Sequence, residues 1–165
     1  MDVADTIREL LYFHDAVTVP GFGTFLTEYQ PAHIHPVQHV FQPPSKRILF
    51  NRNLQANDGL LANALAESEN SSTESALQRI RLFVKNIEAG LMNKEGFEIK
   101  FIGKFQYDIE KNLQFVPDHA SNFLTSSIGL VDFVSPPIIR REETAAQEPE
   151  TKIVEVKKRR WIFWG

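Results

Sequence analysis

The sequence of 165 residues contains no cysteine. This absence excludes a disulfide framework, a zinc–thiolate site and thiol catalysis, and it agrees with a reducing cytoplasmic setting. The amino end, MDVADTIREL, carries acidic residues and no long apolar run, so it does not resemble a secretory signal. With 42% hydrophobic and 24% charged residues, the composition is typical of a globular protein rather than a disordered one.

The sequence also has little positive charge where a DNA-binding protein would need it. Its net charge is −3, and residues 1–70 carry four Lys or Arg against eight Asp or Glu. Residues 71–139 carry seven against eight, and only residues 140–165 are net positive, with seven against five. A domain that grips DNA through its phosphates usually presents a basic face, so this distribution disfavours DNA binding by the folded part.

The first seventy residues predict helices at both ends and strands between them. Residues 3–13 place apolar side chains on one helical face, with Asp2 or Asp5 as the cap. After them, alternating apolar residues favour strands. The further elements expected are strands over 14–29 broken at Pro20-Gly21, an extended arm or long loop over 30–47 that is rich in Pro, His and Gln, a returning strand over 47–54, and a short helix over 57–68 that Asn57 or Asp58 caps.

A second unit follows the polar stretch SENSST. Ser71 and Glu74 have the spacing of a capping box, and apolar residues then recur every three or four positions from Leu77 to Leu91. This pattern indicates the clearest helix of the sequence, and Gly96 is expected to end it. The remaining elements expected are a hairpin over 97–117 with its turn at 110–112, a weak short helix over 121–130 and an extended segment over 131–139.

The two halves repeat each other. The first pair of matching segments is offset by 80 residues and the second by 65, so the first copy holds about fifteen extra residues, in its arm. We therefore predict an α+β protein of two tandem domains, 1–70 and 71–139, of which the second lacks a long arm. The matched positions are GFGTF at 21–25 with FIGKF at 101–105, and Phe50 and Asn57 with Phe115 and Asn122.

The glycines of GFGTF allow two interpretations. A loop that cradles phosphate needs a third glycine and a helix whose amino end faces the anion. Here the chain continues into a predicted strand with no lysine nearby, which favours a tight turn and close backbone contact. Gly21, Gly23 and their counterpart Gly103 are therefore predicted to be turn glycines.

The order of elements and the sequence motifs GFGTF and PPSKRILFNRN resemble the HU/IHF family of bacterial nucleoid proteins. In that family a glycine-phenylalanine-glycine turn starts the hairpin, and a proline-alanine-serine-lysine segment leads back from an arm that embraces DNA. Pro43, Pro44, Ser45 and Lys46, followed by Phe50, match that return segment. The resemblance implies two HU/IHF-like domains, each with a helix, a β-hairpin and a short helix.

The arm departs from the family in its charge. The family's arm carries a proline that wedges between base pairs and cations that hold the phosphates, and Pro36 lies near the tip here. However, no Lys or Arg occurs from Leu26 to Pro44, and only Lys46, Arg47 and Arg52 lie near the base of the arm. Wedging a proline costs a few kcal/mol per unstacked step, which phosphate contacts must offset. DNA bending of the HU kind is therefore disfavoured.

A closer resemblance is to tandem HU-like domains at the amino end of bacterial envelope proteins. Those proteins continue into a membrane span and a SPOR domain, which binds denuded peptidoglycan, and related pairs occur in a eukaryotic centrosomal coiled-coil protein. The resemblance implies that the two copies pack as an intramolecular pseudo-dimer in place of the HU homodimer, since one copy is too small to cover its own helical seam. It rests on VPGFGTF, PPSKRILFN and NDGLLANALA in copy one, and on IGKF, NLQFVPD and NFL in copy two.

The end of the sequence has a different character. Residues 140–156 are polar and aperiodic, which indicates a linker, and four cations then precede a run of aromatic and apolar residues. Cations followed by interfacial aromatics are typical of the start of a membrane span, although five residues cannot cross a bilayer. We expect the chain to be a fragment that continues apolar beyond Gly165. A basic tail or a nucleic-acid patch is the alternative. The predicted membrane-proximal residues are Lys157, Lys158, Arg159, Arg160, Trp161 and Trp164.

No residue pattern indicates catalysis or a cofactor. His33, His35 and His39 cluster on the arm, but without cysteine or nearby acidic ligands they are better explained as exposed side chains than as a metal site. No serine lies in a nucleophile-elbow pattern and no carboxylate pair stands out. The aromatics of the second copy are expected to be core rather than a base-stacking platform. These are Phe101, Phe105, Tyr107 and Phe115.

Together with the resemblance to the envelope proteins, the sequence therefore favours a non-catalytic scaffold on the cytoplasmic face of the bacterial inner membrane. Its expected partner is a protein, and peptidoglycan would be bound only through a domain outside this sequence. The alternative is a module that tethers DNA to the envelope. The candidate partner or DNA contacts are Pro36, Lys46, Arg47 and Arg52.

Overall fold

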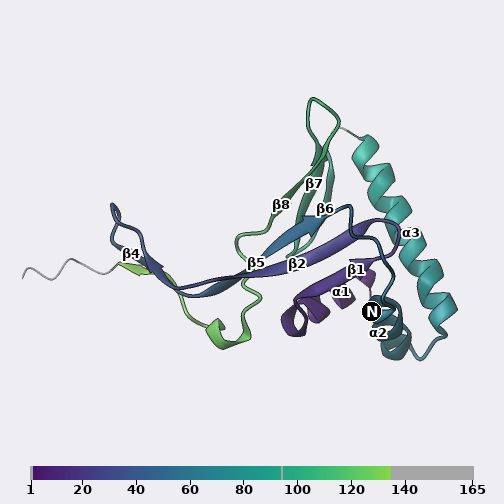
Figure 1. The fold of residues 1–165 in the computed structure, drawn as a ribbon, viewed down its shortest axis with the longest axis horizontal. Helices are drawn as coiled ribbons and strands as arrows, with labels where there is room; N and C mark the ends of the chain where they lie inside the picture. Colours follow the sequence, from purple (N-terminus) through teal and green to yellow (C-terminus); the bar gives the residue numbers. More distant parts are fainter. Residues whose placement is uncertain (1, 94, 135–165) are drawn as a thin grey trace, which may run out of the picture.

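The computed structural model describes residues 2–93 and 95–134. It contains helices and three antiparallel three-stranded sheets, which confirms the predicted α+β class. The helices and two of the sheets form the body of the molecule, and one long ribbon projects from it (Figure 1). The predicted linker over 140–156 and the membrane-proximal residues lie outside the described residues.

Helix α1 (Val3–Phe13) has the bounds predicted from the sequence. The carboxylate of Asp2 accepts a hydrogen bond of 2.7 Å from the amide of Val3, so Asp2 is the N-cap. The cap satisfies an amide that has no partner within the helix. Val3, Ile7 and Leu11 are buried on one face, and they anchor the helix against the body.

The first sheet and the arm are built from the same two strands. Strand β2 (Gly23–Gln30) lies between β1 (Ala16–Val19) and β5 (Ser45–Asn51). Beyond the body these strands continue into a second sheet, and the predicted arm is confirmed as a paired ribbon (Figure 1). The second sheet has the order β3-β4-β9 and consists of β3 (His33–Ile34), β4 (Val40–Gln42) and β9 (Phe133–Val134).

Two helices connect the first sheet to the third. The N-cap of α2 (Leu60–Glu69) is Gly59, so the prediction that the Asn57 or Asp58 side chain caps this helix is wrong. Each of those side chains instead closes a local turn: Asn57 accepts a hydrogen bond from the amide of Gly59, and Asp58 accepts one from Leu60.

The predicted ends of the longest helix, α3 (Thr73–Met92), are also wrong. Ser72, not Ser71, is the N-cap, and its hydroxyl accepts a hydrogen bond from the amide of Ser75. Ser71 belongs to the end of α2 instead, since its amide donates a hydrogen bond to the carbonyl of Ala66. At the other end the helix stops at Met92, before the predicted stop at Gly96, whose amide closes a later turn.

The third sheet has one strand more than the hairpin predicted over 97–117. Its strands, in order, are β6 (Phe97–Ile99), β7 (Gly103–Tyr107) and β8 (Leu113–Pro117). The extra strand arises because residues 100–102 form a tight turn in which the amide of Ile102 donates to the carbonyl of Ile99. The short helix predicted over 121–130 is reduced to a 3-10 turn, η1 (Thr125–Ser127), since Ile128 and Leu130 find no core to cover.

The structure supports the predicted repeat at two positions. A Cβ atom on Gly23 would overlap the ring of Phe50, and one on Gly103 would overlap the ring of Phe115. Gly23 and Gly103 begin β2 and β7, whereas Gly21 lies in the turn before β2 with a positive φ of 77°. Because Gly23 and Gly103 have no side chain, a phenylalanine ring of the returning strand can cover the start of the central strand in each half.

The two halves share one aromatic core. The ring centroid of Phe105, in the second half, lies 5.1 Å from that of Phe22 and 4.8 Å from that of Phe50, both in the first half. The ring of Phe25 in turn contacts that of Phe115 at 5.9 Å. These contacts confirm a core role for Phe105 and Phe115, but the prediction is wrong for Phe101 and Tyr107, which are exposed.

Candidate functional site

The arm is the most distinctive surface of the described molecule. Its β2 and β5 strands pair over seven residues, from Thr24 opposite Asn51 to Gln30 opposite Ser45. Pro36 lies at the tip, in the turn between β3 and β4. The ring of His35 closes this turn, because its Nδ1 accepts hydrogen bonds from the amides of Val37 and Gln38. The arm therefore has an ordered tip rather than an open loop.

The outer part of the arm carries no ionic side chain. No Asp, Glu, Lys or Arg occurs from Tyr29 to Ser45. Apolar side chains are exposed instead: Ile34 is 54% exposed and Val37 at the tip is 80% exposed. Exposed apolar patches of this kind mark interaction sites more often than isolated surface leucines do.

The two cations at the base of the arm are already paired. Lys46 Nζ lies 3.0 Å from Asp15 Oδ1, and an Arg47 guanidinium nitrogen lies 3.0 Å from a Glu28 carboxylate oxygen. The hydrogen bond from Lys46, followed by that from Thr27, lowers the pKa of the Asp15 carboxyl. A phosphate approaching Lys46 or Arg47 would therefore compete with a carboxylate that each cation already contacts.

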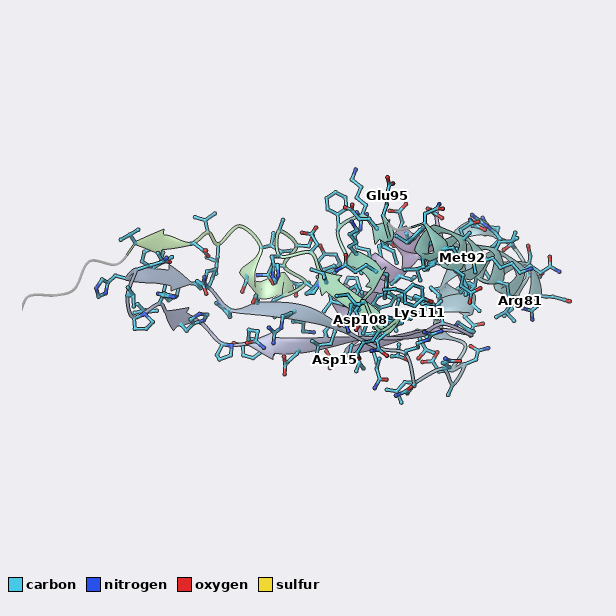
Figure 2. All side chains as sticks on the ribbon, turned by 90° about the horizontal axis from the view of Figure 1, so that it is seen from above. Asp15, Arg81, Met92, Glu95, Asp108 and Lys111 are labelled. Atoms are coloured by element: carbon cyan, nitrogen blue, oxygen red, sulfur yellow. The ribbon has the colours of Figure 1, made fainter. Side chains whose placement is uncertain are left out.

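Arg52 belongs to a different part of the molecule. It follows the body end of β5, whereas Lys46 and Arg47 lie near the arm end of the same strand. Arg52 and Lys111 flank a groove of about 580 Å³ whose other lining residues are Leu91, Met92 and Tyr107. Figure 2 shows Met92 and Lys111 on the body, away from the arm. The four predicted contact residues therefore do not converge on one site.

A C-terminal segment lies along the arm, and we call residues 118–134 the strap. The side chain of Asn122 accepts a hydrogen bond of 3.1 Å from the amide of Lys46 and donates one of 3.2 Å to the carbonyl of Pro44. Further out, the ring of Phe133 stacks on that of Phe41 with centroids 4.7 Å apart. This contact between the strap and the arm was not predicted from the sequence. The signal available was a polar Asn122 beside an apolar, strand-prone end.

Comparison with protein families accounts for most of the described chain. Residues 1–58 match the model of the CCDC81-like prokaryotic HU domain 1, and residues 59–127 match that of the CCDC81-like prokaryotic HU domain 2. Residues 1–127 are two tandem CCDC81-like prokaryotic HU domains. The HU/IHF-type recognition from the sequence is thereby confirmed. No curated protein and no solved structure matches the chain.

The matched ranges assign the structural elements to the two CCDC81-like HU domains. The first range includes α1, the first sheet and the arm, and the second begins at residue 59 and includes α2, α3 and the third sheet. The predicted division after residue 70 stays a prediction. The last part of the strap, residues 128–134, lies beyond both ranges, although it supplies a strand to the arm. The matched ranges therefore do not include β9, which forms one edge of the arm sheet.

The described part of the CCDC81-like HU pair offers little for chemistry. Within residues 2–93 and 95–134, no group of three His, Cys, Asp or Glu is placed to hold a metal ion. His33 is exposed, and His35 serves the tip turn. No helix among these residues has the length and apolar character needed to cross a bilayer. The arm, its paired base and the strap are thus the features on which a function can be argued.

Proposed function

We propose that the CCDC81-like HU pair is a non-catalytic protein-interaction module that acts as a scaffold. The observation that carries this proposal is the arm: it projects from the body, exposes Ile34 and Val37, and has no ionic side chain from Tyr29 to Ser45. Depletion of charge and exposure of apolar side chains are typical of the centre of protein–protein interfaces. HU-like domains bind rather than catalyse, which agrees with this role.

The two domains work as an intramolecular pseudo-dimer in this proposal. Phe22, Phe25 and Phe50 of the first domain pack against Phe105 and Phe115 of the second. This shared aromatic core takes the place of the subunit interface in a homodimer. The pair would therefore present one arm on a single, covalently joined platform.

The module lies at the cytoplasmic face of the bacterial inner membrane in this proposal. The support is in the sequence: four cations over 157–160 are followed directly by Trp161 and a further apolar run. Clustered Lys and Arg beside an anionic leaflet contribute about 1 kcal/mol each. By resemblance, the full protein is of the SPOR type and is associated with cell division. It would bind peptidoglycan through a domain outside this sequence.

Tethering of DNA to the envelope is the second candidate, and the HU relationship favours it. The charges of the arm count against it, because Lys46 is paired with Asp15 and Arg47 with Glu28. Phosphate binding that relies on such cations weakens steeply as salt rises. The two candidates therefore make opposite predictions for binding in low salt.

A pull-down from bacterial lysate, with and without nuclease, separates the two functions. The scaffold proposal expects protein partners that survive nuclease and are lost in the arm variant Val37→Asp. The variant Ile109→Asp, at the tip of the other hairpin, is the matched control and should keep them. A duplex-DNA mobility shift at low salt that disappears at moderate salt would replace the scaffold with the DNA tether. Loss of the captured proteins after nuclease treatment would do the same.

A further inference from the structure

The strap is anchored to the body at its inner end, residues 118–127. Phe123 is 1% exposed there, and its ring centroid lies 4.9 Å from that of Tyr12 in α1. Asn122 binds the backbone at the base of the arm through two hydrogen bonds. A buried ring and two hydrogen bonds therefore hold the inner strap in place, and they fix the point from which the rest of the strap extends.

The outer strap, residues 128–134, has much less support. Ile128 and Val131 are 72% and 74% exposed, so they add little to any core. Strand β9 pairs with β4 over two residues, and the ring of Phe133 stacks on that of Phe41. Segments with few buried apolar contacts open at a lower free energy than the core around them. The outer strap is therefore expected to leave the arm without unfolding of the body.

A buried hydroxyl lies where the inner strap meets the outer strap. Ser127 in η1 is 2% exposed, and no described residue forms a hydrogen bond with its Oγ. A hydroxyl that is removed from water without a partner destabilises the arrangement that buries it. Movement of the outer strap would return this hydroxyl to water, which lowers the free-energy cost of opening.

Strand β9 covers an edge of the arm that β4 would otherwise present (Figure 1). The amide of His35 donates to the carbonyl of Val40, so the backbone groups of Val40 point to β3. Because these directions alternate along a strand, the backbone groups of Phe41 point to β9. The ring of Phe133 also covers part of Phe41. Removal of β9 would thus expose unpaired backbone groups and an aromatic ring, which an added strand can recognise.

We propose that the outer strap is a displaceable cover, and that the protein partner adds an extended segment to the β4 edge in its place. This inference rests on the proposed function and specifies how the arm binds its partner. The strap itself indicates the chemistry of that segment, because it occupies the edge as a strand with an aromatic residue opposite Phe41 and an aliphatic residue opposite Val40. Ile34 lies opposite Phe41 on β3, so an aromatic side chain of the partner would extend the apolar row that Ile34 begins.

The absence of cysteine allows the cover to be locked in the full chain. Val40 and Val134 are cross-strand partners whose backbone groups do not bond each other, and such pairs have Cα atoms about 4.5 Å apart, within the range of a disulfide. Oxidation of the double variant Val40→Cys/Val134→Cys should tie β9 to β4, and dithiothreitol should release it. The matched control is Tyr107→Cys/Leu113→Cys, a pair of the same kind in the third sheet.

The probe is a fluorescent peptide with the sequence of residues 128–134, and its anisotropy measures binding. We expect the peptide to bind the reduced Val40→Cys/Val134→Cys variant roughly tenfold or more tightly than the oxidised one, because a tied strap cannot leave the edge. The control pair should bind the peptide equally in both redox states. A peptide with the same residues in scrambled order should bind neither variant.

Two single variants should shift the affinity for the peptide in opposite directions. Phe133→Ala removes the stacked ring from the strap, so peptide binding should tighten by roughly three- to tenfold. Ser127→Ala removes the buried hydroxyl, so the cover should close more firmly and peptide binding should weaken by roughly fivefold. Ser126→Ala, an exposed change beside it, should leave the affinity unchanged. The amount of protein captured from bacterial lysate should follow the same order.

The outcomes separate this inference from the proposed function. Equal peptide binding by the oxidised and reduced double variant overturns the displaceable cover. A peptide that binds no form, while lysate proteins are still captured and are lost in Val37→Asp, also overturns the cover and leaves the scaffold standing. Redox-dependent peptide binding without any captured protein supports the cover and refutes the scaffold function. Dimers that form as protein concentration rises and that the peptide dissociates would assign the edge to a second copy, and would overturn the partner segment.

Discussion

The hairpins of the two domains begin alike and end differently. In both, a phenylalanine ring covers a glycine at the start of the central strand, and the two rings, Phe50 and Phe115, meet in one core. In the second domain the strands then close at once through the turn at 108–112, which contains Asp108, Glu110 and Lys111. In the first they run on into an uncharged arm. The comparison teaches that the core fixes the bases of the two hairpins in the same way, whereas their outer ends differ in length and in charge.

Removing a ring of the shared core is expected to have the largest effect on stability, and it tests whether the two halves depend on each other. We expect Phe105→Ala and Phe25→Ala each to lower the free energy of unfolding by about 3–5 kcal/mol, because each ring is fully buried between the halves. Denaturant unfolding followed by circular dichroism measures the loss. Both variants, like the wild type, should unfold in a single transition. Two separate transitions in the wild type would show that the halves are independent.

The two covered glycines should respond alike. Gly23→Ala and Gly103→Ala each place a Cβ atom against a phenylalanine ring and a backbone carbonyl. We expect each change to cost roughly 1–3 kcal/mol, the usual range for overpacking. Ser126→Ala, an exposed change in η1, is the control in the same denaturation assay. A large loss at one glycine with none at the other would contradict the equivalence of the hairpins.

The asparagines paired by the repeat should respond differently. Asn122→Ala removes both hydrogen bonds of Asn122 to the arm, whereas Asn57→Ala removes only a local turn contact. We expect the first change to cost about 1–2 kcal/mol, because the amide of Lys46 and the carbonyl of Pro44 lose their partner. Amide hydrogen exchange should speed up at Lys46 in Asn122→Ala and stay unchanged there in Asn57→Ala. Equal exchange in the two variants would mean that the strap does not hold the arm.

The smallest effect concerns pH at the base of the arm. Lys46 lowers the pKa of the exposed Asp15 carboxyl. The contribution of this pair is therefore complete above the ordinary pKa of an aspartate, near 4, and is lost as the pH falls through the lowered value. Stability measured from pH 6 to pH 2 should fall less in Asp15→Asn than in the wild type. An equal loss of stability between pH 6 and pH 2 in both proteins would show that the pair contributes nothing.

The local parts of the fold could be predicted from the sequence, because their signals lie within a few residues. Helix α1 has an aspartate cap and a regular apolar face, and both appear as expected. The strap could not be predicted, since its contact joins the side chain of Asn122 to the backbone of Lys46, 76 residues earlier. The third sheet was mistaken for a hairpin because Phe101 takes a positive φ of 65°, which a phenylalanine rarely adopts.

For the candidate site, the sequence predicted the charge-free arm but not its surroundings. Lys46 and Arg47 were expected as contacts because composition reveals cations and not their partners. Asp15 and Glu28, which neutralise them, lie 31 and 19 residues away in the chain. Arg52 was grouped with them by proximity in sequence. The straight path of β5 separates it from them in space.

Because the phenylalanines that join the halves belong to a single polypeptide, the pairing does not depend on how many copies a cell contains. A homodimer falls apart on dilution, whereas linked partners meet at a fixed, high effective concentration. Two domains in one chain also need not obey the twofold symmetry that would force both hairpins to be identical. A protein present in few copies can thus keep its two halves assembled, with a single arm projecting from one side.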